Sequence, residues 1–125
     1  MTIAGELMEV ILYVRHMGAQ VSFYRDVLGI PVKEPAGIQD FSELFWVQLD
    51  TGSCTLALHG GAEGRYGKDA PKIVFRVSNV AASRAKLLQD GVTMGDVRSP
   101  GPGIQVCDGR DPEGSKFSIE SREQV

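Results

Sequence analysis

Residues 23–29 read Phe-Tyr-Arg-Asp-Val-Leu-Gly, and they close a segment with a helical pattern of apolar side chains. From Ala19 onward these side chains recur at steps of three and four residues, which is the spacing of one face of an α-helix. Gly29 and then Pro31 follow, and both residue types are typical of the end of a helix. The pattern therefore predicts a short amphipathic helix over residues 19–28.

Strand-forming residues flank this helix on both sides. Met8 to Val14 is a run of β-branched and aromatic residues that predicts a buried strand. A weak edge strand is expected over residues 30–33. Two further apolar stretches, 45–49 and 54–58, are joined by Asp50-Thr51-Gly52-Ser53, whose Asp and Gly favour a tight hairpin turn.

The same order of elements recurs in the second half of the chain. Residues 72–77 predict a strand, and Asn79 is a suitable N-cap for a helix that ends before Gly91. The remaining segments are three predicted strands, 92–97, 104–107 and 116–119, and two turns, 99–103 and 111–114.

This recurrence predicts an internal duplication. Residues 9–16 align with residues 72–79, and both stretches precede a helix that ends at a glycine. We expect an α+β fold in which two paired βαβββ modules form one curved mixed sheet, with the helices outside and a cleft inside. The whole chain, residues 1–125, is then a single domain with module 1 at about 7–59, a linker at 60–71 and module 2 at about 72–121.

Two motifs resemble those of a known family. Residues 23–29 resemble the FYxDxLG signature in the first helix of the vicinal oxygen chelate superfamily, and Asp111-Pro112-Glu113-Gly114 resembles its DPDG turn before the last strand. The superfamily includes glyoxalase I, bleomycin resistance proteins, fosfomycin resistance enzymes and extradiol dioxygenases. The resemblance implies the paired-module fold and, as in many relatives, a homodimer. It leaves the activity open, because this fold hosts enzymes and binding proteins alike.

The resemblance also implies where a metal ion would be bound. The positions that carry metal ligands in the enzymes are held here by Glu9, Ala57, Lys72 and Ser118. Glu9 could ligate a metal ion, but the ammonium group of Lys72 would repel one. Glu120 lies on the same strand face as Ser118, two residues further on. We therefore expect no metal and no other cofactor, and we expect Glu9 and Lys72 to face each other as an ion pair at the floor of the cleft.

Strand alternation selects the side chains that would line this cleft. Residues that alternate with the apolar core positions of each strand point to the opposite face of the sheet. Aromatic walls with a few polar groups are typical of a small-molecule site. The expected ligand-binding residues are Glu9, Tyr13, Trp46, His59, Lys72, Arg76 and Ser118, with Gln48 beside Trp46 if Phe45, Val47 and Leu49 belong to the core.

Composition excludes several classes of partner. Thirteen Lys and Arg against sixteen Asp and Glu give a net charge of −3, which offers no cationic field for nucleic acid. No apolar run approaches the roughly 20 residues that cross a bilayer, so we expect no membrane partner and a cytoplasmic protein. The two cysteines lack the spacing of a disulfide or metal motif and are expected to be reduced thiols.

These expectations favour a metal-free protein that binds a small organic molecule, a drug or a metabolite. The alternative is a metal-dependent lyase, isomerase or dioxygenase of the same superfamily, in which Glu9, His59 and Glu120 gather a metal ion. A third possibility is a metal-free enzyme that uses Glu9 as a base. The catalytic residues of either enzyme are unknown at this point.

Overall fold

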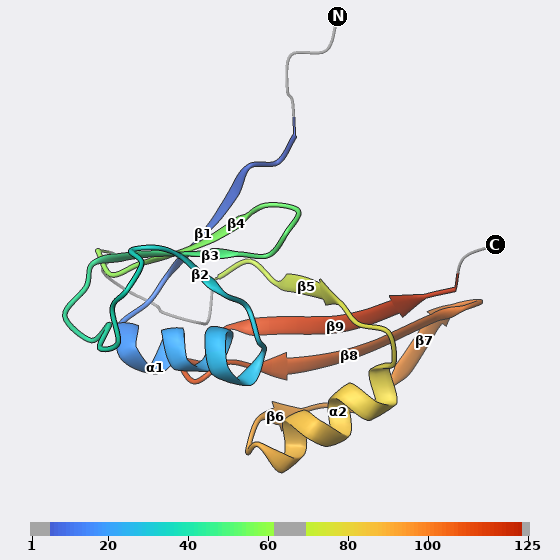
Figure 1. Ribbon diagram of the computed structural model, residues 1–125. Helices are drawn as coiled ribbons and strands as arrows, with labels where there is room; N and C mark the ends of the chain where they lie inside the picture. The colour runs from blue at the N-terminus through green and yellow to red at the C-terminus, as the bar shows by residue number, and fades with distance from the viewer. Residues whose placement is uncertain (1–5, 62–69, 124–125) are drawn as a thin grey trace, which may run out of the picture. The chain divides into compact units, whose positions relative to one another are not determined.

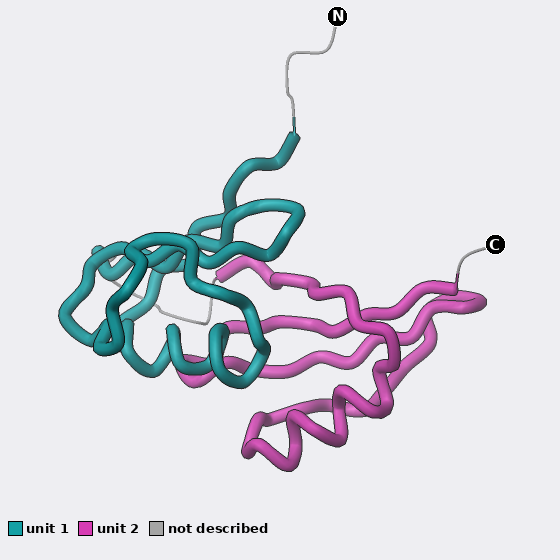
Figure 2. Tube along the Cα trace, in the orientation of Figure 1, with its two compact units in different colours: residues 1–64 teal, residues 65–125 magenta. Residues whose placement is uncertain are grey.

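Two sheets with the same strand order organise the chain. The computed structural model describes residues 6–61 and 70–123 and divides the chain into two units, Met1–Gly64 and Arg65–Val125 (Figure 2). Each unit combines one sheet with helical structure, so the predicted α+β fold is confirmed. Most of the predicted linker at residues 60–71 lies outside the described residues. Among the described residues, no helix is both long and apolar enough to span a membrane.

The first unit has a four-stranded sheet in the order β1-β4-β3-β2 (Figure 1). Strand β1 runs parallel to β4, and the other neighbours are antiparallel. Helix α1 contacts β4. The elements are β1 (Glu9–Tyr13), α1 (Met17–Val21), the π-helical segment η1 (Ser22–Val27), β2 (Val32–Glu34), β3 (Trp46–Asp50) and β4 (Thr55–His59).

The second unit repeats this order as β5-β9-β8-β6, with an additional strand, β7, paired to β8. Strand β5 runs parallel to β9 as β1 does to β4, and the other pairs are antiparallel. This shared order confirms the internal duplication, while the cleft between the modules stays a prediction. The elements are β5 (Ile73–Arg76), α2 (Val80–Gln89), β6 (Thr93–Met94), β7 (Arg98–Gly101), β8 (Ile104–Arg110) and β9 (Lys116–Arg122).

The helix around residues 23–29 begins earlier than predicted and widens in its second half. It starts at Met17, and the Leu28 N–H donates to the Phe23 carbonyl at 3.0 Å, the i to i−5 bond of a π-helical turn. Gly29 then adopts φ +79°, which lets the Ile30 N–H donate to the Tyr24 carbonyl and close the helix. Tyr24 is fully buried, so this end of the helix is fixed against the core.

Helix α2 follows the sequence prediction closely. The Asn79 side chain accepts a hydrogen bond of 2.9 Å from the Ala82 N–H, as an N-cap should. Gly91 follows the last turn with φ +83°. Val80 and Leu87 are buried, and α2 contacts β6, β8 and β9 along one face of the second sheet (Figure 1).

The second sheet is larger than the sequence predicts. Strands β8 and β9 pair over seven residues each and extend past the apolar segments 104–107 and 116–119. Strand β7 lies where a turn was predicted over 99–103. The added residues, 108–110 of β8 and 120–122 of β9, are mostly polar. Their strand structure therefore depends on backbone pairing between β8 and β9 rather than on burial of apolar side chains.

Candidate functional site

The face of the first sheet opposite its core carries the side chains that alternate with the core residues. Leu12 of β1 and Val14, which follows the strand, are buried. Ile11 and Tyr13 of β1 are 38% and 48% exposed. Strand β4 departs from this alternation, because Thr55 and Ala57 are buried along with the core residues Leu56 and Leu58. Only His59, at the end of β4, is partly accessible on this strand.

His59 is the centre of an aromatic cluster formed with Tyr13, Phe45 and Trp46. The strand register sets Tyr13 and Trp46 on either side of His59, with ring centroids at 5.2 and 5.4 Å. Phe45 adds an edge contact at 4.9 Å. The His59 Nδ1 atom accepts a hydrogen bond of 2.8 Å from the Gly61 N–H, which fixes the orientation of the imidazole ring.

Phe45 is a correction to the sequence prediction. Alternation with Val47 and Leu49 predicts a core position, but the Phe45 side chain is 63% exposed. Strand β3 begins only at Trp46, and Phe45 lies before it, where the Phe45 carbonyl accepts from the Gly60 N–H at 2.8 Å. Because Phe45 lies outside the strand, it does not follow the alternation of β3 and joins the aromatic cluster instead.

The opposite end of the same sheet face is polar. Glu9 accepts a hydrogen bond of 3.1 Å at Oε1 from the Gln48 side chain. Beside it, the Lys33 ammonium donates to the Thr55 hydroxyl at 3.0 Å. Glu9 and Tyr13 are four residues apart on one strand, so about 13 Å separates the polar end from the aromatic cluster.

A cluster of charged and polar groups surrounds Asp108 on the second sheet. Its carboxylate accepts a hydrogen bond of 2.6 Å from Arg98 and a short one from the Ser118 hydroxyl. The Lys72 ammonium lies 3.6 Å from the same carboxylate. The hydrogen bonds from Arg98 and Ser118, with a smaller contribution from the Lys72 charge, hold the pKa of Asp108 below its usual value despite the opposing effect of burial. Asp108 is therefore an ionised acceptor at neutral pH.

Sequence reasoning missed Asp108. The predicted strand ends at Cys107 because the apolar run ends there, whereas β8 continues to Arg110. The signal was present in the alternation of Val106, Asp108 and Arg110, which the ladder sets opposite Glu120, Ser118 and Lys116. Extending the strand by this alternation would have placed Asp108 and Arg110 on one face of the sheet, whereas the partner Ser118 follows from the register of β8 and β9.

The predicted site residues fall into two groups, one on each sheet. Glu9, Tyr13, Trp46 and His59 share the face of the first sheet opposite its core, and Lys72, Arg76 and Ser118 share one face of the second. Within its own unit, Glu9 bonds Gln48 and Lys72 pairs with Asp108. The Glu9–Lys72 ion pair joins two units that are each described separately, and it stays a prediction.

The donor chemistry of the implied metal positions does not match a metal site. Ala57 offers only a methyl group, Ser118 uses its hydroxyl proton to bond Asp108, and Lys72 presents a cation. Glu9 alone supplies a carboxylate. Across residues 6–61 and 70–123, no three His, Cys, Asp or Glu side chains are grouped so that they could hold a metal ion.

Comparison with known proteins agrees with this fold. The family model of the Glyoxalase/Bleomycin resistance protein/Dioxygenase superfamily matches residues 6–119. The crystal structure of TnmS3, an antibiotic binding protein from Streptomyces sp. CB03234, is similar with a TM-score of 0.76 and 18% identity, over 98% of this chain and 99% of that one.

Two further solved structures cover comparable lengths. A lactoylglutathione lyase from Agrobacterium tumefaciens has a TM-score of 0.73 and 18% identity over 96% of both chains. An integron cassette protein from the mobile metagenome of V. cholerae has a TM-score of 0.74 and 22% identity, over 98% of this chain and 99% of that one. A search of the curated proteins gave no match. At these identities the likeness is one of fold.

Proposed function

The chain belongs to the Glyoxalase/Bleomycin resistance protein/Dioxygenase superfamily, and we propose that within this superfamily it is a metal-free protein that binds a small organic molecule. The observation that carries the proposal is the aromatic cluster of Tyr13, Phe45, Trp46 and His59. The likeness to an antibiotic binding protein agrees with a drug or a metabolite as the ligand.

The aromatic cluster suits a flat, apolar ligand. Tyr13 and Phe45 are 48% and 63% exposed although both are large apolar side chains, so covering their rings would remove apolar surface from water. Each additional ring contact contributes about 0.5–1.5 kcal/mol beyond that burial. The hydrogen bond from Gly61 holds His59 in place, so the ligand would meet a surface that is already ordered.

The polar end of the same face would set the orientation of the ligand. Glu9 is half-buried and held by Gln48, with its second carboxylate oxygen available to accept a hydrogen bond from a ligand hydroxyl or amine. The distance of about 13 Å between Glu9 and Tyr13 suits an elongated molecule that carries aromatic rings at one end and a hydrogen-bond donor at the other.

The donor set argues for binding without a metal ion. Of the four positions that hold metal ligands in related enzymes, only Glu9 has a suitable side chain, and Lys72 would oppose a cation. The competing function is a metal-dependent lyase, isomerase or dioxygenase that assembles Glu9, His59 and Glu120 around a metal ion. Metal-free base catalysis by Glu9 is the remaining alternative.

Trp46 provides a direct test, because it is the only tryptophan in the chain. Its fluorescence would be titrated with neutral aromatic compounds that carry a donor, such as 4′-hydroxyflavone and acridone. We expect saturable quenching and at least a tenfold weaker dissociation constant in Tyr13→Leu. Leu88→Ala is the matched control, because Leu88 is 43% exposed on α2, outside the aromatic cluster, and its removal should leave binding unchanged.

Two results would contradict the proposal. The first is an equal increase of the dissociation constant in Tyr13→Leu and Leu88→Ala. Binding would then not depend on the aromatic cluster. The second is one tightly bound nickel, zinc, iron or manganese ion per chain in the purified protein, together with turnover of a glutathione hemithioacetal. That pair of observations would establish the metal-dependent enzyme instead.

A further inference from the structure

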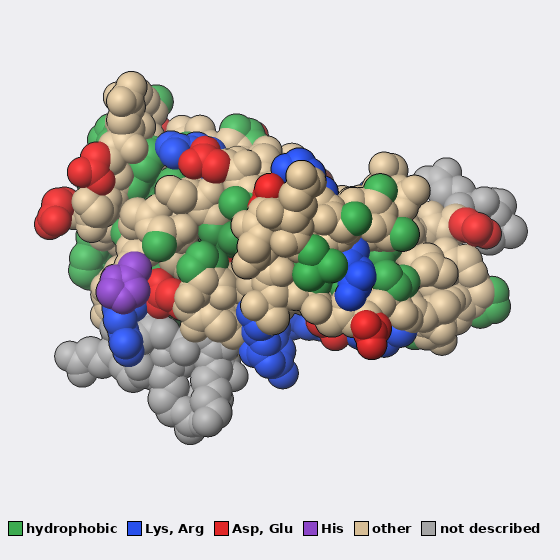
Figure 3. All heavy atoms as spheres, turned by 90° about the horizontal axis from the view of Figure 1, so that it is seen from below, with side chains coloured by type: hydrophobic (Ala, Val, Ile, Leu, Met, Phe, Trp, Pro, Cys, Tyr) green, Lys and Arg blue, Asp and Glu red, His purple; other side chains and the backbone are tan. Residues whose placement is uncertain are grey.

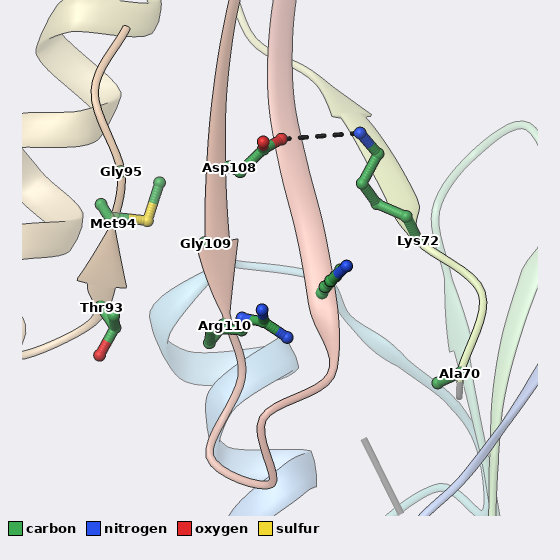
Figure 4. Close-up of a pocket in the computed structure, with 9 residues that line it drawn as sticks. Ala70, Lys72, Thr93, Met94, Gly95, Asp108, Gly109 and Arg110 are labelled. Carbon is green, nitrogen blue, oxygen red and sulfur yellow. Dashed lines mark ion pairs between the residues drawn. The ribbon is translucent and has the colours of Figure 1, made fainter. Parts of the chain in front are cut away.

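The second unit contains a cavity of about 670 Å³ on the sheet face that carries Asp108 (Figure 4). We propose that this cavity binds the carboxylate or phosphate group of a small organic anion. Its size lies in the range of about 300–1,000 Å³ typical of small-molecule sites and is much larger than a single inorganic ion requires. The charged and hydroxyl side chains that line it are Lys72, Thr93, Asp108, Arg110 and Lys116.

Cations outnumber the one carboxylate in this lining. Lys72, Arg110 and Lys116 face a single acid, Asp108, in a protein whose net charge is −3. On the face drawn in Figure 3, Lys and Arg side chains are interspersed with Asp and Glu. The cavity therefore has a local excess of positive charge, whereas the chain as a whole is negatively charged.

Asp108 offsets only part of the positive charge of these cations. Its carboxylate oxygens are engaged by Arg98 at 2.6 Å and by the Ser118 hydroxyl, neither of which lines the cavity. Lys72 is 3.6 Å from the carboxylate, beyond ordinary hydrogen-bond length, and points toward it from across β9 (Figure 4). Because an ammonium group has three N–H donors, Lys72 retains donors for a ligand.

Arg110 and Lys116 form a like-charged pair. They are direct cross-strand partners on β8 and β9, an arrangement that costs stability unless an anion lies between the two charges. Neither has a carboxylate partner among the described residues. Arg110 donates through Nη1 to the Gly114 carbonyl at 3.0 Å, which positions the guanidinium while its other N–H groups remain for a ligand.

Thr93 of β6 also lines the cavity. It lies opposite Arg110 in the β6–β8 ladder, so its hydroxyl can add a neutral hydrogen bond to an oxyanion. Arginine recognises the planar oxygens of carboxylate or phosphate, and a neighbouring lysine adds charge. The inference goes beyond the proposed function, because it assigns an anionic ligand to a cavity lined by residues of the second unit, separate from the aromatic cluster of the first.

The test uses citrate and pyrophosphate as probes on the full chain, in calorimetric titrations at constant ionic strength. We expect at least one of them to bind, and Lys116→Gln and Arg110→Gln each to raise its dissociation constant at least tenfold. Lys86→Gln is the matched control, because it removes the same charge from α2 of the same unit, outside the cavity, and should change binding less than twofold. Binding of citrate alone or of pyrophosphate alone supports the inference and identifies the group.

Two outcomes would overturn the inference: no binding of either probe, or equal weakening by Lys86→Gln and Lys116→Gln. Circular dichroism spectra would confirm that each variant is folded. If one of the two cavity variants fails to fold, the other still tests the inference. If neutral compounds still quench Trp46 while citrate and pyrophosphate fail, only the anion assignment is wrong. If anions bind through Lys116 while no neutral compound quenches Trp46, the aromatic-ligand function is wrong and the anion site stands.

Discussion

Replacing Gly109 by alanine would test the register that sets Asp108 and Arg110 on the cavity face. A Cβ atom at Gly109 would lie 2.5 Å from the Met94 sulfur and 2.8 Å from Cζ of Phe117, whereas ordinary contacts are 3.4–4 Å. Met94 can move its flexible side chain, but the Phe117 ring is fully buried and cannot withdraw. Overpacking of this kind costs about 1–3 kcal/mol, and we expect Gly109→Ala to lower the free energy of unfolding by that amount.

Urea unfolding followed by circular dichroism would measure the effect. Gly95→Ala is the control, because its nearest neighbour would be the Asp108 carbonyl at an ordinary 3.6 Å and neither glycine has a positive φ. Its change should stay within about 0.5 kcal/mol. Phe117→Leu should cost less in the Gly109→Ala protein than in the original, with a coupling of about 0.5–3 kcal/mol. Equal stability of the Gly109→Ala and Gly95→Ala proteins would refute the register and the cavity built on it.

Two further predictions concern the helix cap and the titration of Asp108. Asn79→Ala should destabilise the protein by about 1 kcal/mol in the same unfolding assay, because the Ala82 N–H loses its acceptor, while Asn79→Asp should retain most of the stability. The lowered pKa of Asp108 means that its ionised form stabilises the fold above the ordinary aspartate value of 3.8 and that this contribution is lost as pH falls through the lower folded value. The stability advantage of the original protein over Asp108→Asn should therefore be constant above pH 5 and shrink below about pH 4; an advantage that grows on acidification would contradict the Arg98 and Ser118 contacts.

The fold could be predicted because its signals are local. Gly29 and Gly91 end their helices with the positive φ angles that glycine permits, and Asn79 caps α2. Asp111 accepts hydrogen bonds of 2.9 Å from the N–H groups of Glu113 and Ser115, which explains why the four-residue turn motif is recognisable in the sequence. Each of these features depends on residues that are adjacent along the chain.

The extent of the second sheet could not be predicted in the same way. The polar ends of β8 and β9 have no apolar alternation of their own and exist because each strand supplies the other with backbone partners. The π-helical turn before Gly29 was also missed, since its apolar spacing resembles that of an ordinary α-helix. Strand length and helix widening are decided by pairing and packing rather than by local propensity.

For the candidate site, the sequence determined which side chains alternate away from the core, and that was enough to select Tyr13, Trp46 and His59 as neighbours on one face. Only the tertiary structure exposed Phe45, buried Ala57 and gave Lys72 a partner in Asp108. Alternation is a property of a single strand, so sequence reveals it. The partner of a charge is set by the register between strands that are distant along the chain, and that register is fixed only when the whole sheet assembles.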